Sequence, residues 1–114
     1  MRTKTLWIKD EYLDWILAGR KTTEVRVAYS NIARLQPGDH LLLNDRYPFR
    51  IFAIGRYANF EELLAHEDAG AIAPDLPARQ LLTALRALYP AEKEALGVVA
   101  LKIISEPFLP DNSA

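Results

Sequence analysis

The segment Gly19-Arg20-Lys21-Thr22-Thr23-Glu24-Val25-Arg26 constrains the fold most, because a helix is predicted to end at its glycine and a strand to follow at once. Apolar residues recur at helical spacing between positions 13 and 17, and a glycine after them favours a left-handed C-terminal cap. From Thr22 the residues alternate in character, so a strand places Thr22, Glu24 and Arg26 on one face. One carboxylate and two cations are therefore expected to lie close together.

The remaining chain is predicted to hold further strands and helices around this segment. Asp10 and Asn59 are expected to cap two helices, and Gln36-Pro37-Gly38-Asp39 is a strong turn signal. The predicted strands are residues 5–8, 22–27, 40–44, 49–57 and 97–105, and the predicted helices are 10–18, 60–66 and 75–89. The order of these elements indicates an α+β fold. A mostly antiparallel sheet of five to six strands avoids exposed edges best by curling into a small β-barrel, flanked here by about three helices.

The length of 114 residues fits one domain, which we place at residues 1–105, followed by an extended tail at 106–114 that contains two prolines. No apolar run reaches the roughly 20 residues of a membrane helix. The amino terminus lacks the pattern of a secretory signal, so a cytoplasmic location is expected. The chain has no cysteine, which excludes disulfides and thiolate nucleophiles.

No pattern of histidines and carboxylates has the spacing of a metal site, and we expect neither a metal nor another cofactor. The two histidines, His40 and His66, are expected at the surface. The net charge is −1, but residues 1–56 hold ten Lys or Arg against six Asp or Glu, and residues 57–114 hold four against nine. This asymmetry is compatible with a local anion-binding face in the first half of the chain.

Gly19-x-Lys21-x-x-Glu24-x-Arg26 resembles the G-x-K-x-x-E-x-R signature of the ASCH domain family, small β-barrels related to the PUA domain. Pro37-Gly38-Asp39 before a strand, and the segment from Leu85 to Pro90 before the last strand, agree with the resemblance, which spans roughly residues 4–104. It implies a cleft between barrel and helices that binds RNA or a modified nucleoside.

The residue chemistry agrees with such a ligand. Lys21 and Arg26 can neutralise phosphates, and Glu24 can orient Arg26 or accept a hydrogen bond from an exocyclic base amine. Trp7, Trp15, Tyr29, Tyr47 and Tyr57 offer stacking surfaces worth about 1–3 kcal/mol per base, although Trp15 lies close enough to an apolar helical stripe to favour a packing role. The predicted binding residues are Lys21, Glu24, Arg26, Trp7, Lys9 and Tyr29. We expect a monomer without an obligate protein partner.

Two alternatives remain open. The first is that the three charges form a surface ion-pair set in a non-catalytic interaction domain, at roughly 0–1 kcal/mol per pair. The second is a hydrolase, because relatives in the superfamily act on acetylated cytidine or cleave RNA. In that case the catalytic candidates are Lys21, Thr22, Thr23 and Glu24, with Glu67 or Asp68 as a further acid.

The amidohydrolases of the superfamily carry threonine where this chain has Glu24. Glu24 beside two cations is also expected to stay ionised, which suits an electrostatic clamp better than a general acid. The sequence therefore favours binding over amide hydrolysis and leaves enzymatic turnover open.

Overall fold

The structure, a computed structural model, describes residues 2–106, so most of the predicted tail at 106–114 lies outside the described residues. Five strands form one sheet in the order β1-β3-β4-β5-β2. Only the pairing of β1 with β3 is parallel, and the other three pairings are antiparallel. The strands are β1 (Thr3–Leu6), β2 (Thr23–Val27), β3 (His40–Leu43), β4 (Tyr47–Tyr57) and β5 (Val98–Ser105). The predicted α+β fold with a mostly antiparallel sheet is confirmed.

Three helices have seven or more residues, namely α1 (Asp10–Leu17), α3 (Phe60–His66) and α5 (Ala78–Leu88). Three single-turn helices, α2 (Ser30–Ala33), α4 (Ala69–Ile72) and α6 (Ala91–Glu94), complete the described part of the chain. None of the helices between residues 2 and 106 has the length and apolar character needed to cross a membrane.

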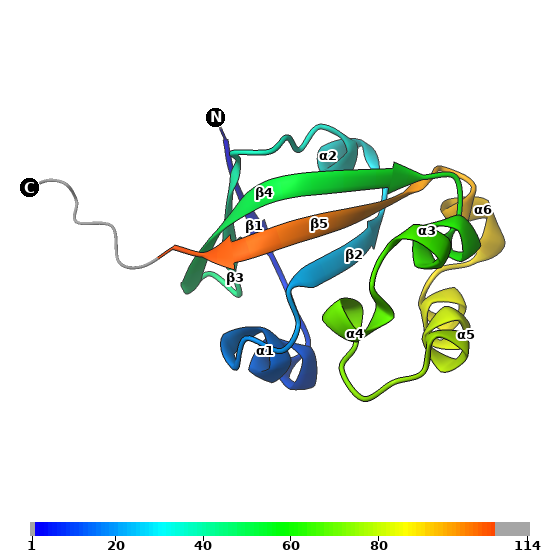
Figure 1. Cartoon of the computed structure of the whole chain (residues 1–114). Coiled ribbons are helices and arrows are strands. Elements are labelled where there is room, and N and C mark those ends of the chain that lie inside the picture. Colours follow the sequence, from blue (N-terminus) through cyan, green and yellow to red (C-terminus); the bar gives the residue numbers. More distant parts are fainter. Residues whose placement is uncertain (1, 107–114) are drawn as a thin grey trace, which may run out of the picture.

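The sheet is strongly curled into a half-barrel whose outer strands are β1 and β2 (Figure 1). The barrel prediction is therefore right in shape, although β1 and β2 are joined by no backbone ladder within residues 2–106. Helices α3, α4 and α5 gather beside one end of the sheet, and α1 lies near the start of β2 (Figure 1). The edge of β2 that faces away from β5 has no pairing strand within residues 2–106.

Buried side chains form two clusters on the two faces of the sheet. On β5, Val99, Leu101 and Ile103 belong to the cluster inside the curl, which also contains Leu13 and Ile16 of α1. Val98 and Ala100, which alternate with them, belong to the cluster beneath α3, α4 and α5. Both faces of β5 are therefore buried, as its nearly unbroken apolar sequence requires.

The local turn predictions are confirmed where backbone geometry decides them. Gly19 and Gly38 have φ values of +79° and +96°, which residues with a Cβ rarely adopt. Asn59 caps α3 by accepting a hydrogen bond from the Glu62 backbone N–H at 2.8 Å. The returning carboxylate of Glu62 accepts from the Ala58 N–H at 2.7 Å, one residue before the position that a standard capping box uses.

Three local predictions need correction. The first strand covers residues 3–6 rather than 5–8, because its parallel partner β3 ends opposite Leu6. Asp10 is the first helical residue of α1, and Lys9 occupies the N-cap position without a side-chain cap. Two segments that lie outside the predicted helices and strands, 28–35 and 67–74, contain the single turns α2 and α4.

Candidate functional site

A cleft of about 480 Å³ lies along the free edge of β2, between α1 on one side and α4 and α5 on the other. Consecutive residues of β2, Glu24, Val25 and Arg26, all line it, which is possible only at the edge of a sheet, because successive side chains point to opposite faces. The cleft therefore uses the edge that the half-barrel leaves open. Its remaining lining residues are Trp7, Ile8, Lys9, Glu11, Tyr12, Trp15, Lys21, Ile72, Ala73, Leu76, Leu81, Ala84, Leu85, Leu88 and Tyr89.

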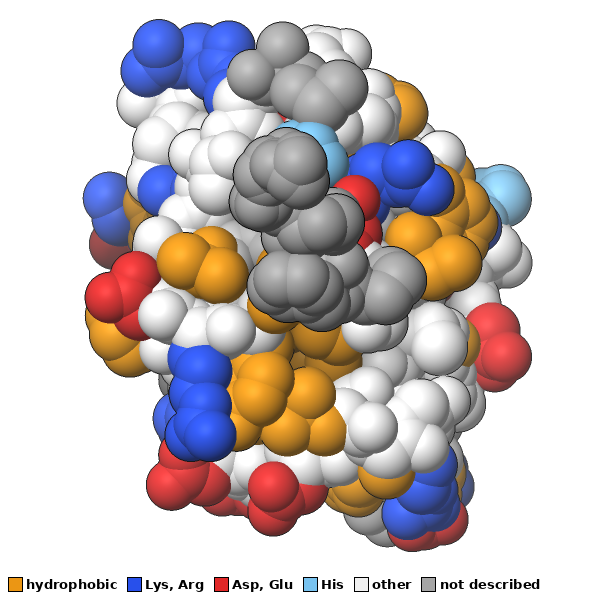
Figure 2. All heavy atoms as spheres, turned by 90° about the vertical axis from the view of Figure 1, so that its left-hand side faces the viewer, with side chains coloured by type: hydrophobic (Ala, Val, Ile, Leu, Met, Phe, Trp, Pro, Cys, Tyr) orange, Lys and Arg blue, Asp and Glu red, His pale blue; other side chains and the backbone are white. Residues whose placement is uncertain are grey.

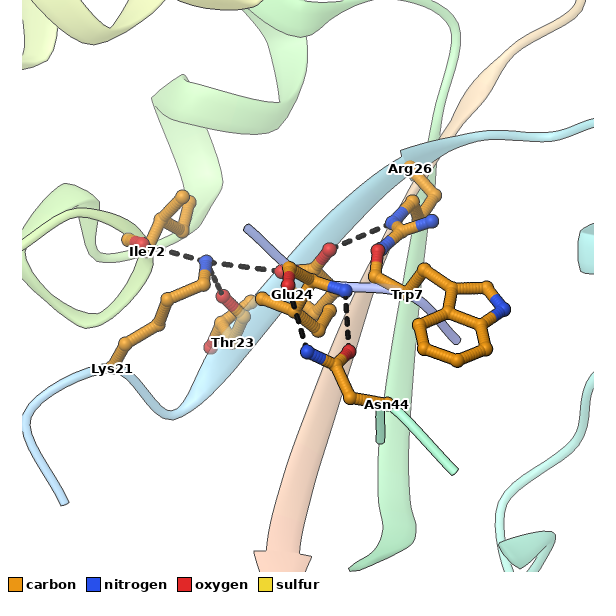
Figure 3. Close-up of polar contacts among 8 residues, drawn as sticks. Trp7, Lys21, Thr23, Glu24, Arg26, Asn44 and Ile72 are labelled. Carbon is orange, nitrogen blue, oxygen red and sulfur yellow. Dashed lines mark hydrogen bonds and ion pairs between the residues drawn. The ribbon is translucent and has the colours of Figure 1, made fainter. Parts of the chain in front are cut away.

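The floor of the cleft holds a buried lysine. Lys21 is 6% exposed, and its ammonium group donates to the carbonyls of Thr23 at 2.8 Å and Ile72 at 2.7 Å. Its third acceptor is Glu24 Oε1 at 3.2 Å, so every ammonium proton has a partner within the protein (Figure 3). Burial lowers the pKa of Lys21, and the nearby Glu24 carboxylate opposes this shift. Lys21 thus connects the mouth of β2 to the end of α4.

Glu24 is held between two cations. Its Oε2 accepts a hydrogen bond from Arg26 Nε at 2.7 Å, and its Oε1 faces Lys21, so the carboxylate is fixed in orientation (Figure 3). Arg26 Nη2 donates in turn to the carbonyl of Trp7 at 3.0 Å. The Arg26 side chain therefore links β2 to the residue that follows β1, across the open side of the half-barrel.

The segment that follows β1 is clamped by Asn44. Its side-chain oxygen accepts from the Ile8 N–H at 2.7 Å, and its amide group donates to the Ile8 carbonyl at 2.9 Å (Figure 3). Asn44 has a φ of +53°, a conformation that asparagine tolerates better than most residues. This clamp holds Trp7 at the cleft while leaving its side chain 68% exposed.

Further aromatic side chains line the walls. Trp15 of α1 stacks on Tyr12 with ring centroids 5.7 Å apart, and it is only partly buried. Tyr89, at the end of α5, lies on the opposite wall. Burial raises the pKa of Tyr89, and the positive charge of Arg26 opposes the shift. The phenol is therefore neutral at physiological pH and close to the Glu24 and Arg26 pair.

The structure brings five of the predicted binding residues together at this cleft, namely Trp7, Lys9, Lys21, Glu24 and Arg26. Tyr29 is not among the lining residues; its ring lies 5.8 Å from the ammonium group of Lys93. The hydroxyl candidates Thr22 and Thr23 do not line the cleft either. Thr23 is buried and contributes only its carbonyl, to Lys21.

The two further acids considered for a hydrolase lie elsewhere. The side chain of Glu67 is 6% exposed and is paired with Lys102 at 3.2 Å. Asp68 accepts a hydrogen bond from the Gly70 N–H at the start of α4. Neither of these acids lines the cleft.

Sequence reasoning missed Asn44, Tyr12 and Tyr89 as parts of the site. A positive-φ turn residue carries no local signal that its amide will clamp the segment after β1, 36 positions earlier. Tyr12 lies next to the apolar stripe of α1, and Tyr89 lies at the end of α5. From the sequence, both residues look like ordinary packing residues. Trp15 was expected to have a packing role. It packs against the buried cluster beneath α3, α4 and α5, and it also lines the cleft.

The chemistry of the lining sets limits on a ligand. The cleft carries three cations, Lys9, Lys21 and Arg26, against the two carboxylates of Glu11 and Glu24. The other lining residues are apolar or aromatic, so a flat apolar group with a few polar edges fits better than a multiply charged one. Between residues 2 and 106, no three His, Asp or Glu side chains cluster in a way that would hold a metal ion.

Fold and site together define a class: α+β half-barrels with an aromatic-lined cleft at the open sheet edge and a Lys-Glu-Arg cluster on its floor. The chain matches the ASCH domain over residues 6–108, and it belongs to the ASCH domain family. ASCH domains are PUA-like and implicated in RNA binding.

Solved structures support the same assignment. The crystal structure of hypothetical protein PH0355 is 26% identical, covers 93% of this chain and all of its own, and superposes with a TM-score of 0.85. The solution NMR structure of protein PF0455 from Pyrococcus furiosus is 26% identical, with 95% of this chain and all of that one covered, at a TM-score of 0.77. Comparison with curated proteins finds no significant match.

Proposed function

We propose that this protein binds RNA or a modified nucleoside by taking one nucleobase into the cleft. The observation that carries the proposal is the position of Trp7, whose indole is 68% exposed at the mouth of a cleft with a fixed carboxylate and guanidinium on its floor. Leu88, which is 50% exposed, lines the same cleft, and exposed apolar side chains that gather in a groove mark ligand-binding sites. A base stacked on Trp7 would gain about 1–3 kcal/mol.

The polar side chains on the floor of the cleft can form hydrogen bonds with the edge of a bound base. Glu24 has remaining acceptor capacity for an exocyclic amine, because each of its oxygens has a second lone pair. Arg26 uses Nε and one proton of Nη2 within the protein, which leaves Nη1 and the second Nη2 proton for a carbonyl, a ring nitrogen or a phosphate. A cleft of about 480 Å³ is within the usual range for small-molecule sites.

A hydrolase is the second candidate. The observation in its favour is the lowered pKa of Lys21, since a buried lysine in a cleft is a common feature of catalytic sites. Against it, the three acceptors around the ammonium group leave no proton directed at a ligand, and Thr22 and Thr23 lie outside the lining. Binding therefore has more support than turnover.

The test uses intrinsic fluorescence, because both tryptophans of the chain line the cleft. Nucleosides, N4-acetylcytidine and short single-stranded RNA are titrated into the wild type, W7A and the control F52A. Phe52 is 56% exposed and lies outside the cleft, so F52A removes an exposed aromatic ring without touching the site. W7A is expected to weaken binding by about 5- to 150-fold, as the loss of 1–3 kcal/mol of stacking implies.

The same samples, incubated and analysed by mass spectrometry, decide between binding and hydrolysis. Unchanged ligand supports a binding protein, and free acetate or RNA fragments that form with wild type but not with an added E24Q variant support the hydrolase. If no ligand changes the fluorescence and no product forms, the proposed function is wrong.

A further inference from the structure

A second groove lies between the start of β1 and α2. It encloses about 430 Å³ and is lined by six residues, Arg2, Thr3, Lys4, Thr5, Asn31 and Arg34. Half of these residues are cations, and none is acidic. Two hydroxyls and one amide add neutral hydrogen-bond donors. We propose that this basic groove binds the phosphate backbone of an RNA strand whose base occupies the cleft, so that the ligand is an RNA chain rather than a free nucleoside; this rests on the proposed function.

The cations of the basic groove are available to a ligand. Arg34 donates from Nε to the Ser30 carbonyl at 3.3 Å, and its terminal nitrogens have no protein partner in the part of the chain that the structure describes. Arg2 lies 3.8 Å from the carboxylate of Asp39, but its own side chain is 52% exposed. Lys4 has no ion-pair or hydrogen-bond partner for its ammonium group within residues 2–106. Exposed and weakly paired cations are the groups that exchange small counterions for phosphates.

Charge distinguishes the two sites. The cleft balances three cations with two carboxylates, whereas the basic groove carries three cations and no carboxylate. The chain as a whole has a net charge of −1, so this local excess is not a consequence of a basic composition. Figure 2 shows the general distribution of charge on one face of the molecule, with a group of Lys and Arg side chains at one upper corner. A polyanionic backbone is therefore attracted to the groove more strongly than to the cleft.

Strand β1 connects the two sites. Lys4 lines the basic groove and Trp7, the residue after β1, lines the cleft; they are three positions apart in the chain, which is roughly 10 Å at 3.3 Å per residue. A base stacked on Trp7 thus leaves its neighbouring phosphates within reach of Lys4. The outer edge of β1 has no pairing strand within residues 2–106, so backbone from a partner could also reach it. Three cations without an acid favour phosphates over a peptide in that place.

The experiment compares the double variant K4Q/R34Q with the control R79Q/K93Q, which removes two cations from the other side of α5 and from α6, outside both sites. Labelled single-stranded hexanucleotides are titrated at about 50 and about 200 mM salt, and nucleosides are titrated by tryptophan fluorescence. We expect K4Q/R34Q to weaken hexanucleotide binding about tenfold and to reduce the salt slope by about 1.4, since each phosphate contact on a single strand contributes about 0.7. Nucleoside affinity and the control variant remain at wild-type values.

The outcomes separate this inference from the proposed function. If nucleosides bind and K4Q/R34Q leaves hexanucleotide affinity and salt slope unchanged, the basic groove has no role and the inference is wrong. If hexanucleotide binding depends on Lys4 and Arg34 but not on Trp7, the groove binds RNA and the cleft does not, which overturns the proposed function and the placement of a base in the cleft but keeps the groove as a phosphate site. An oligoglutamate peptide that displaces the hexanucleotide at equal concentration would assign the groove to acidic protein partners and overturn the inference.

Discussion

Lys21 Nζ lies 3.2 Å from Glu24 Oε1, and both residues are more than nine-tenths buried. Lys21, the lysine of the family motif, thus has a structural role as an internal strut: its ammonium group holds the Glu24 carboxylate and donates to the carbonyl of Ile72 at the end of α4. A variant of Lys21 changes the shape of the cleft as well as its charge. Loss of binding in such a variant would not by itself show that Lys21 touches the ligand.

The first prediction concerns this strut. K21M should lower the free energy of unfolding by about 3 kcal/mol, at the low end of the range for breaking a buried ion pair, because Arg26 still neutralises Glu24. Urea denaturation followed by circular dichroism measures the change. K9M is the matched control, since Lys9 is an exposed lysine of the same cleft and should shift stability by less than about 0.5 kcal/mol. Equal stabilities of K21M and wild type would contradict this structural role of Lys21.

The second prediction concerns the clamp on the Trp7 segment. N44G keeps the left-handed backbone at φ +53° but removes both hydrogen bonds to Ile8, so it should cost about 1–3 kcal/mol of stability and weaken ligand binding. D45G is the control, because Asp45 also has a positive φ, +62°, and its side chain is exposed. Acrylamide quenching of Trp7 in a W15F background should increase in N44G only. Unchanged quenching in N44G would show that the segment does not need the clamp.

The third prediction concerns a close approach between β4 and the segment after α3. A Cβ at Gly55 would lie 2.5 Å from Glu67 Oε2 and 2.8 Å from the Tyr57 hydroxyl. These atoms cannot easily move, because Glu67 is buried, accepts a hydrogen bond from Tyr57 and pairs with Lys102 at 3.2 Å. That hydrogen bond, with burial, raises the pKa of Tyr57 to about 12.

G55A should therefore destabilise the protein by about 1–3 kcal/mol through overpacking. A double-mutant cycle with E67A measures the coupling, since removal of the carboxylate also removes the main clash. The cost of G55A should shrink by more than half in the E67A background. Additive costs would mean that the strain at Gly55 has another source.

The fourth prediction is a pH dependence. Glu94 accepts hydrogen bonds from the Phe60 N–H at 2.9 Å and from the Arg86 guanidinium at 3.2 Å, and these bonds hold its pKa below its ordinary value of 4.5. A carboxyl whose pKa is lower in the folded state stabilises the fold fully above the unfolded pKa. This stabilisation is lost as the pH falls through the folded pKa.

Unfolding free energies of wild type and E94Q should therefore differ most at pH 6–7, by about 1–3 kcal/mol, and converge as the pH falls below the lowered pKa of Glu94. Urea titrations across this range measure the difference. E92Q is the control, because Glu92 is exposed on the same single-turn helix. A constant difference between wild type and E94Q at every pH would show that packing, and not the charge of Glu94, is responsible.

Much of the fold follows from local sequence. The left-handed glycines at 19 and 38 follow a helix and lie in a turn where they were predicted, because glycine has no Cβ and tolerates positive φ without strain. Asn59 caps α3 for the same local reason. The alternation along β5 assigns its two faces correctly, since strand geometry fixes which residues share a side.

The parallel pairing of β1 with β3 could not be predicted from local sequence, because no residue in either strand specifies which strand it will pair with. That pairing sets where β1 ends and shifts the strand by two residues from its predicted position. It also places Trp7 and Ile8 beyond the strand, where Asn44 can reach them. The error in the strand boundary and the omission of Asn44 from the site have the same cause.

The sequence by itself determined that Lys21, Glu24 and Arg26 meet at the start of a strand, because a glycine cap and a period of two place them there. Tertiary structure alone decided what each one does. Burial under the end of α4 turns Lys21 inward, the open edge of β2 leaves Glu24 and Arg26 facing a cleft, and α5 brings Tyr89 to the far wall. Solvent exposure and the choice of hydrogen-bond partner depend on segments up to 51 residues apart, and no local pattern specifies them.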